Sequence, residues 1–363
     1  MRLSLEARAR PARIMLWASP LLAAAASVIG VSILFAVLGR PPLTALYVLF
    51  IAPLESLDGL AELALKATPL LLCAIGIAVG CRAEVWNIGA EGQFTLGAIC
   101  GGGVALAFGG NDSWWLLPLM LLAGVAGGMA WAAIPALLKT RFNAHEILTT
   151  LMLTYVSIQL LGYLVHGPWK DPQGYSFPQT KQFESDAMLP MLIEGTRLHI
   201  GVLFALAAVP LGSILLGRTM TGFRIRTVGA APAAARYAGF SRSGVVWFCL
   251  LLSGGMAGLA GICEVAGPDG QLTPVISPGY GFAAIIVAFL GRLNPIGILF
   301  SSALMALLYL GGEGLQVTMQ LPIAVTGTVQ GMLLFFLLAA DVLINFRVRV
   351  RPSRAAAGAA RHA

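Results

Sequence analysis

The sequence has little charge. Only 11% of its 363 residues are Asp, Glu, Lys or Arg, whereas 58% are hydrophobic. A soluble domain carries about 25% charged residues, so this chain cannot cover itself with a water-compatible surface. Apolar stretches of roughly 18–25 residues recur along it, and each is long enough to cross a bilayer as a helix. They are continuous rather than alternating, which excludes a transmembrane barrel. The sequence predicts an all-α, polytopic membrane protein.

The sequence also lacks the motifs of common hydrolases. It has no G-x-x-x-x-G-K-[ST] phosphate loop, and its lysines all lie in other contexts. It has no H-E-x-x-H motif, no G-x-S-x-G motif and no pair of intramembrane acids. The chain is therefore predicted not to be an enzyme and to bind no cofactor itself. Without a phosphate loop, this chain is not expected to hydrolyse ATP itself.

Cysteine pairs with functional spacing are missing as well. All the cysteines lie in apolar segments, with no C-x-x-C motif and no histidine nearby in the sequence. Such cysteines are typically free thiols that pack as small apolar side chains. No pair of residues has the spacing of metal ligands, so no metal site is predicted. The cysteines are Cys73, Cys81, Cys100, Cys249 and Cys263.

About ten apolar segments are predicted to cross the membrane. A shorter run, 43–53, is bounded by prolines and is expected to lie at the interface or to form a cap. The segments 280–291 and 295–311 are also short, and two interpretations stay open: two short spans, or a broken helix with a re-entrant piece. The ten segments are 15–38, 62–81, 88–108, 114–138, 146–166, 198–217, 244–266, 280–291, 295–311 and 322–345.

The basic residues are unevenly distributed between these segments. With the N-terminus inside, 18 of the 23 Lys and Arg residues fall on the inward side. The positive-inside rule then predicts that both termini are cytoplasmic. A single membrane domain, 15–345, is expected between basic cytoplasmic tails at 1–14 and 346–363. It would carry an external loop at 167–197 and a cytoplasmic loop at 218–243.

One polar stretch, VWNIGAEGQF (85–94), interrupts a very apolar region. Irregular polar backbone at membrane depth is tolerated where protein buries it or where it lines a cavity. One interpretation is that the stretch opens a span beside the translocation path, where amide side chains contact a polar solute. The other is a turn in which Glu91 is the first-turn acid of the next helix. The residues assigned to the substrate pathway are Asn87, Gly89, Glu91, Gly92 and Gln93.

The cytoplasmic loop contains signals for a short helix. Pro232 suits the first turn of a helix, the three alanines that follow are strong helix formers, and Gly239 suits a left-handed C-terminal cap. This helix is either a simple connector with positive charge or a docking surface for a cytoplasmic partner.

Three segments resemble the permeases of bacterial ABC importers of the branched-chain amino acid, ribose and nucleoside family. They are VWNIGAEGQFTLGA, VGAAPAAARYAGFSRSG with the span after it, and SPGYGFAAIIVAFLGRLNPIG (277–297). The first resembles the nucleoside and simple-sugar branch in particular. The resemblance implies a type II importer fold of about ten helices, some short or broken. It also implies that the cytoplasmic loop couples to the ATPase through Gly229, Pro232, Ala235, Arg236, Tyr237 and Gly239.

The predicted function is therefore that of an ABC-importer permease subunit in the bacterial inner membrane. Its substrate would be a nucleoside or a simple sugar. The resemblance implies ATPase subunits, a second homologous permease, in a homo- or heterodimer, and an extracytoplasmic substrate-binding protein as partners. Membrane lipid, but no nucleic acid, is expected to contact the chain. The alternative is an ion-coupled secondary transporter of small polar solutes, which would work without an ATPase.

Overall fold

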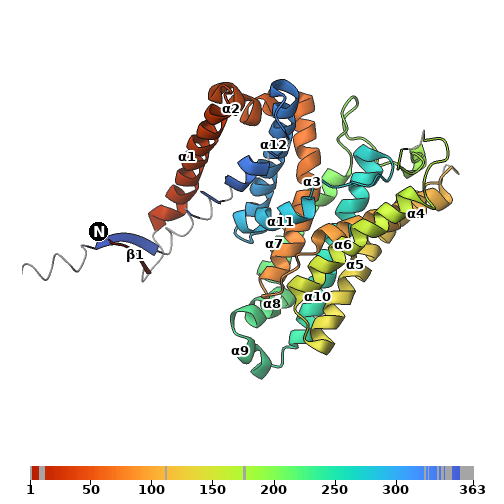
Figure 1. Cartoon of the computed structure of the whole chain (residues 1–363). Coiled ribbons are helices and arrows are strands. Elements are labelled where there is room, and N and C mark those ends of the chain that lie inside the picture. Colours follow the sequence, from red (N-terminus) through yellow and green to blue (C-terminus); the bar gives the residue numbers. More distant parts are fainter. Residues whose placement is uncertain are drawn as a thin grey trace, which may run out of the picture. The chain divides into compact units, whose positions relative to one another are not determined.

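The computed structural model of the chain is almost entirely helical (Figure 1). It describes residues 2–7, 13–110, 113–174, 177–322, 324–325, 327–332, 335–336, 339 and 346–351. The chain divides into two compact units, which we describe separately. One comprises Met1–Pro53 and Gly311–Ala363, and the other comprises Leu54–Leu310.

The unit Leu54–Leu310 contains most of the helices, and we call it the central unit. It also includes a short 3-10 turn, Ser185–Ala187, and a π-helical turn, Val265–Asp269, that follows directly after Glu264. Its helices are α3 (Leu57–Cys81), α4 (Ala90–Phe108), α5 (Leu116–Phe142), α6 (Glu146–His166), α7 (Gly201–Arg218), α8 (Met220–Ala230), α9 (Pro232–Tyr237), α10 (Arg242–Glu264), α11 (Tyr280–Leu290) and the first part of α12 (Pro295–Met319).

The other unit contains the two ends of the chain. It holds α1 (Arg13–Val37), α2 (Pro42–Phe50) and the last part of α12. Strands β1 (Arg2–Ala7) and β2 (Phe346–Arg351) pair antiparallel, with Arg2 opposite Arg351 and Ala7 opposite Phe346. The all-α prediction therefore omitted a two-stranded ribbon at the termini, in the segments expected to be plain basic tails. The short helix α2 corresponds to the predicted non-crossing run 43–53.

Six described helices are long and apolar enough to cross a membrane, judged by length and composition. Shorter apolar helices occur at Ala25–Val37, Pro42–Leu54 and Tyr280–Leu290 within the described residues. Nine of the ten predicted spans coincide with a described helix, whereas half of 322–345 lies outside the described residues. The residues described between 324 and 339 are helical. The chain is thus a multi-pass helical protein, and the number of ten crossings stays a prediction. The six candidates are α3, α5, α6, α7, α12 and α10 with its π-helical turn.

The core of the central unit is a seam of small residues where α10 packs against α4 and α5. A Cβ added at Gly258 of α10 would collide with the carbonyl oxygen of Gly124 on α5. A Cβ added at Gly97 of α4 would collide with the backbone of the same Gly258. Such contacts are typical of membrane helices, which lack a hydrophobic driving force between them and associate through close backbone approach.

The predicted external loop 167–197 is not a free loop in the structure. Its backbone bonds to the segment after α10: the N–H of Thr180 donates to the carbonyl of Leu272, and that of Phe183 donates to Gly270. Arg197 then forms a two-pronged ion pair with Glu62 at the start of α3, with both N–O distances at 2.8 Å. The connection therefore forms a fixed cover over one end of the helices.

His199 is buried where this cover meets α7. Its Nδ1 accepts a hydrogen bond from the N–H of Gly201 at 3.1 Å, so the ring is neutral with its proton on Nε2. The ring packs against Gly267 in the π-helical turn. Burial lowers the pKa of His199 from 6.5 to about 4.

The protein should lose stability on acidification through His199. Between pH 6.5 and 4 the unfolded chain binds a proton at this histidine and the folded chain does not. Stability therefore falls as the pH drops through this window, by about 3 kcal/mol for a shift of this size, and is unaffected above it. Thermal unfolding of His199→Asn, which keeps an acceptor at the Nδ1 position, should show a flatter pH dependence. The same change at the exposed His166 is the control, and an equal slope in wild type and His199→Asn would contradict the assignment.

Candidate functional site

The polar stretch after α3 forms a turn and an extended segment. The turn contains Glu84 with a φ of 56°, after which the chain runs without helical structure up to α4. Arg82 donates from Nη2 to the carbonyl oxygen of Leu293 at 3.1 Å, and the ring of Trp86 stacks on that of Phe289 at 5.5 Å. The segment is therefore held alongside the break between α11 and α12.

Asn87 and Gln93 pair through their side-chain amides. Asn87 Nδ2 donates to Gln93 Oε1 at 2.7 Å and also to Ser253 Oγ of α10 at 2.8 Å. Gln93 Nε2 donates back to Asn87 Oδ1 at 3.1 Å, and the same oxygen accepts the N–H of Gly89. Both amides are buried, so these bonds replace the water that each group would otherwise require.

Glu91 joins the beginnings of two helices. It lies in the first turn of α4, and its Oε2 accepts the N–H of Gly281, in the first turn of α11, at 2.6 Å. The Ser277 hydroxyl and the N–H of Phe282 also bond to this carboxylate. Because helix N-termini carry partial positive charge, one buried carboxylate stabilises both. We call Asn87, Glu91, Gln93, Ser253 and Ser277 the polar junction.

The polar junction lies far from the ends of α10. Ser253 is eleven residues beyond Arg242, where α10 begins. At 1.5 Å per residue this is about 16 Å along the helix axis. The hydrocarbon core of a bilayer is about 30 Å thick, so in a crossing helix this position is near the midplane. Two helices therefore begin at this depth, a geometry that membrane transporters use beside their binding sites.

The two predicted glycines lie against α6. A Cβ at Gly89 would lie 2.7 Å from the carbonyl oxygen of Thr150, and one at Gly92 would lie 2.7 Å from Thr154 Cα. Any larger residue would separate α4 from α6. Glu91 thus lies in the first turn of α4, as expected if it only stabilises the start of that helix. The position of the junction beside the middle of α10 is also the one expected if the stretch borders a substrate path.

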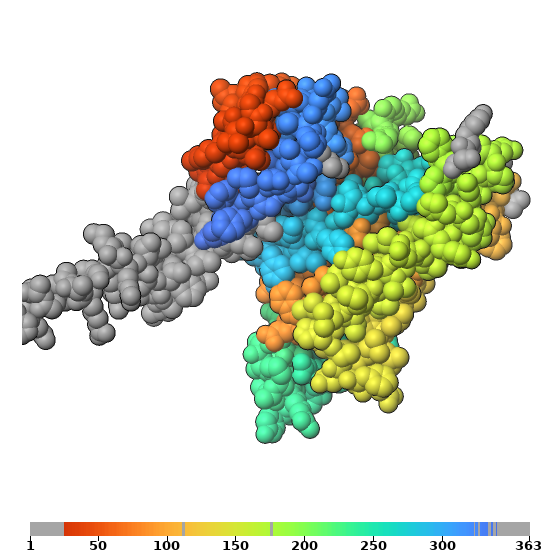
Figure 2. Space-filling view, viewed as in Figure 1, coloured from red at the N-terminus to blue at the C-terminus, as the bar shows by residue number. Residues whose placement is uncertain are grey.

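The predicted cytoplasmic helix is present as α9, with Pro232 in its first turn. Gly239 follows it with a φ of +78°, the left-handed conformation expected for the cap. Ala235 is buried, whereas Tyr237 is 95% exposed and Arg236 is also exposed. The helix therefore packs on the protein through Ala235, and the side chains of Arg236 and Tyr237 face outward. Figure 2 shows the segment around α8 and α9 (green) at the surface.

An additional helix, α8, precedes α9 and was not predicted. The predicted coupling residue Gly229 lies on it, and a Cβ there would collide with the carbonyl oxygen of Arg82. Gly229 thus packs α8 directly against the turn after α3, and that turn leads into the polar junction.

The described residues contain no cluster of metal ligands. No group of three His, Cys, Asp or Glu side chains within them has a geometry that could hold a metal ion. All five cysteines are free thiols, as the sequence predicted. What the junction does is to position helices, because its donors and acceptors bond to one another across α4, α10 and α11.

Sequence reasoning missed Ser253 and Arg82 as members of this arrangement. Ser253 is 166 positions from Asn87, and Arg82 is 211 positions from Leu293, so no local pattern connects either pair. Ser277 could have been found from the sequence, because it is the first residue of the motif SPGYGFAAIIVAFLGRLNPIG (277–297). Its hydroxyl accepts the N–H groups of Gly279 at 3.0 Å and Tyr280 at 2.9 Å, a local bond that Ser commonly makes in turns.

Apolar helices long enough to cross a membrane, two helix beginnings beside the middle of α10 and the exposed helix α9 are together typical of a membrane permease. The family model described as "Branched-chain amino acid transport system / permease component" matches residues 59–338. The chain belongs to this family. Its members are transport subunits rather than enzymes, and they work with ATPase subunits and a substrate-binding protein.

Relatives with assigned names resemble the chain over most of its length. A glucose ABC transporter permease protein of Haloferax volcanii is 35% identical, over 96% of this chain and 94% of the relative. A guanosine ABC transporter permease protein of Bacillus subtilis is 30% identical, over 77% of this chain and 81% of the relative. A nucleoside ABC transporter permease protein of Lactococcus lactis is 28% identical, over 84% and 86%.

Proposed function

We propose that this permease conducts a nucleoside or a simple sugar inward across the bacterial inner membrane. The observation that supports it most is the agreement between the relatives, whose names specify glucose, guanosine and nucleoside. Nucleosides and sugars are both uncharged rings with several hydroxyl groups. The path that suits them has amide and hydroxyl groups rather than ionised side chains.

In this proposal the residues Asn87, Gly89, Glu91, Gly92 and Gln93 border the substrate pathway near its middle. Support comes from the two helix beginnings that meet there and from the depth of Ser253. The role is first of all positional, because the amides of Asn87 and Gln93 bond to each other. The solute passes beside α4 and α11, and these residues keep both helices in place.

The complex in this proposal contains a second homologous permease and ATPase subunits that carry ATP and Mg²⁺. Residues Gly229, Pro232, Ala235, Arg236, Tyr237 and Gly239 belong to the segment that docks on the ATPase. Support comes from the exposure of Arg236 and Tyr237 on a helix held at both ends by local signals.

Uptake into proteoliposomes tests the substrate. The chain, purified with its ATPase and partner permease, should accumulate labelled guanosine or labelled glucose when ATP is present on the ATPase side and the binding protein on the other. No uptake should occur with a non-hydrolysable nucleotide. Accumulation driven by a proton or sodium gradient without ATP would instead identify a secondary transporter, and uptake of neither solute class would refute the substrate assignment.

The proposal also includes ten crossings with both termini cytoplasmic. Gln182 and Ala234 are exposed residues on the predicted outer and inner sides. In a variant without the native cysteines, a membrane-impermeant thiol reagent added to intact spheroplasts should label Gln182→Cys. It should label Ala234→Cys only after the membrane is opened. The reverse pattern, or equal labelling of both, would show that this orientation is wrong.

A further inference from the structure

One face of α10 lines two cavities that meet at Phe248. The first cavity, of about 540 Å³, lies between α8 and α10 and includes Ser241, the N-cap of α10, with Gly244, Val245 and Phe248 of that helix. The second, of about 500 Å³, lies between α3, α7 and α10 and also includes Phe248. From Gly244 and Val245, the next lining residues along α10, at 248, 252, 256 and 259, follow at intervals of three or four, which places them on one side of the helix. The two cavities are therefore parts of one groove.

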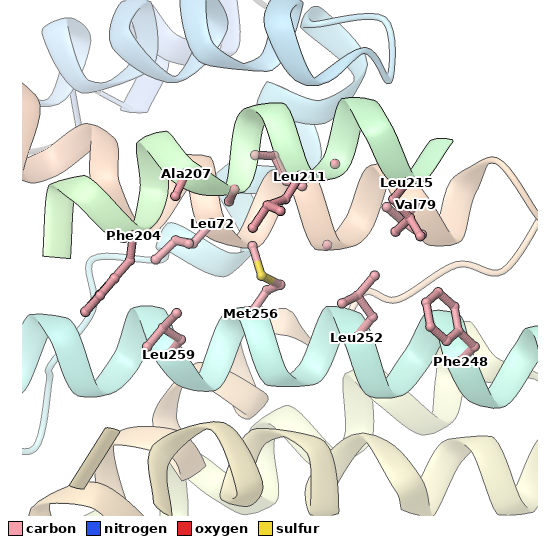
Figure 3. A pocket seen from close by; sticks show the side chains of 14 residues that line it. Leu72, Val79, Phe204, Ala207, Leu211, Leu215, Phe248, Leu252, Met256 and Leu259 are labelled. Atoms are coloured by element: carbon pink, nitrogen blue, oxygen red, sulfur yellow. The ribbon is translucent and has the colours of Figure 1, made fainter. Parts of the chain in front are cut away.

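The second cavity is an apolar trough (Figure 3). Leu252, Met256 and Leu259 of α10 face Phe204, Leu211 and Leu215 of α7 across it, with α3 behind them. Every residue that lines it is apolar. Leu211 is 65% exposed and Ala207 is exposed, so the described residues leave the trough open at the side of α7.

The first cavity is basic. Thr221, Arg224 and Ile225 line it from one face of α8, and the Arg224 guanidinium lies 5.7 Å from the centre of the Phe240 ring. The sequence from 195 to 263 contains no acidic residue, whereas five arginines lie between 218 and 242. Among the described residues, α7, α8 and α9 contain no carboxylate, and the single carboxylate of α10, on Glu264, is at the opposite end of that helix from the groove's basic cavity. A phosphate group is the anion that matches an exposed guanidinium next to polar hydroxyl and backbone groups.

The dimensions match one leaflet of a bilayer. From Phe204 to Leu215 the trough follows eleven residues of α7, which is about 16 Å. Half of a hydrocarbon core is about 15 Å thick. Leu215 is three residues from Arg218, where α7 ends, so the trough starts near the basic end of the helix. One acyl chain therefore fits along it while its phosphate reaches Arg224.

We propose that this groove binds one anionic glycerophospholipid, with its phosphate headgroup at Arg224 and one acyl chain along the trough between α7 and α10. The assignment to the cytoplasmic leaflet rests on the orientation in the proposed function. Binding itself depends only on the groove. Since α8 and α10 flank the coupling helix α9, the lipid would brace the base of that helix.

Native mass spectrometry of the full-length chain in detergent tests this proposal. Phosphatidylglycerol and phosphatidylcholine with identical acyl chains are added in turn, and the retained lipid is counted. The wild-type chain should retain one phosphatidylglycerol in preference to phosphatidylcholine. Arg224→Gln should weaken phosphatidylglycerol retention about fivefold, since one basic residue near an anionic headgroup contributes about 1 kcal/mol. Ala207→Phe, which fills the trough from an exposed position, should weaken retention of both lipids.

Two matched variants serve as controls. Arg226→Gln changes a neighbouring arginine of α8 that does not line the groove and whose Nε bonds to the Gly222 carbonyl. Ala130→Phe changes an exposed alanine of α5 outside the groove.

Equal retention of the two lipids by the wild-type chain, or wild-type retention in Arg224→Gln, would overturn the proposal. So would protection of Arg224 from an arginine reagent by added ATPase but not by lipid, which would assign the pocket to the protein partner. The lipid experiment uses neither ATP nor a transported solute. Its result therefore does not depend on the outcome of the uptake experiment.

Discussion

Replacing Glu91 with alanine is expected to lower ATP-dependent uptake at least tenfold. The carboxylate accepts the N–H of Gly281 at 2.6 Å and bonds to Ser277 and Phe282 at the beginning of α11. Without it, buried donors at a helix N-terminus have no partner, and each such donor costs about 1–3 kcal/mol. The beginnings of α4 and α11 would separate, and the path that they border would lose its shape. Initial uptake rates, normalised to the amount of assembled complex, measure the effect.

A graded series makes this prediction specific. Glu91→Gln keeps one oxygen that can accept the Gly281 N–H and should lose less activity than Glu91→Ala. Glu84→Gln is the matched control, because Glu84 is exposed and lies only seven positions before Glu91 on the same segment. It should transport as the wild type does. Normal uptake by Glu91→Ala would mean that the junction is dispensable for transport.

The second large effect is expected at α9. Tyr237 is 95% exposed, so Tyr237→Ala should not change folding, but it removes an aromatic side chain from a docking surface. Aromatic anchors of this kind contribute 2 kcal/mol or more to binding, so association with the ATPase should weaken roughly 30-fold. Arg236→Glu should act in the same direction by reversing a charge. Association of the purified permease with its ATPase, together with ATP-dependent uptake, measures both variants.

Gly239→Val tests the shape of the segment rather than its contacts. A Cβ at Gly239 meets no atom within 4 Å, so the cost of valine comes from its φ of +78° and amounts to about 1–2 kcal/mol. Gly217→Val is the matched control, since that position is equally open but does not have a positive φ. Tyr163→Ala, an exposed tyrosine on α6, is the control for Tyr237. Unchanged ATPase binding in Tyr237→Ala, Arg236→Glu and Gly239→Val would remove the coupling role from α9.

Length and apolarity predicted most of the helices because these properties are local. The prediction for α12 was wrong at its end: the span was expected to stop at 311, and the helix continues to Met319. Three glycines, Gly311, Gly312 and Gly314, follow the predicted end. In the structure Gly311 serves close packing, since a Cβ there would collide with the backbone of Leu49. A glycine needed for a turn and one needed for close approach look the same in a sequence.

The polar stretch of the candidate site could be found in the sequence because its polarity is also a local property. Burying Asn87, Glu91 and Gln93 in an apolar region is costly, so the stretch stood out from the sequence alone. Its partners did not, because Ser253 and Gly281 approach it only through the tertiary fold. The capped helix α9 was predicted from local signals, whereas the packing of residues 180–189 on the segment after α10 depends on contacts about 80 to 90 positions away.

The glycine seam between α4, α5 and α10 has a consequence for how the permease can move. Helices that touch backbone to backbone have no side chains between them that could switch rotamers or slide. These three helices are therefore expected to move together as one rigid body. The break at Gly291 to Asn294, where Arg292 and Leu293 both have positive φ values, is a joint with irregular backbone. When the permease opens and closes, we expect rotation of the backbone at such breaks, whereas the packing of α4, α5 and α10 at the glycine seam stays unchanged.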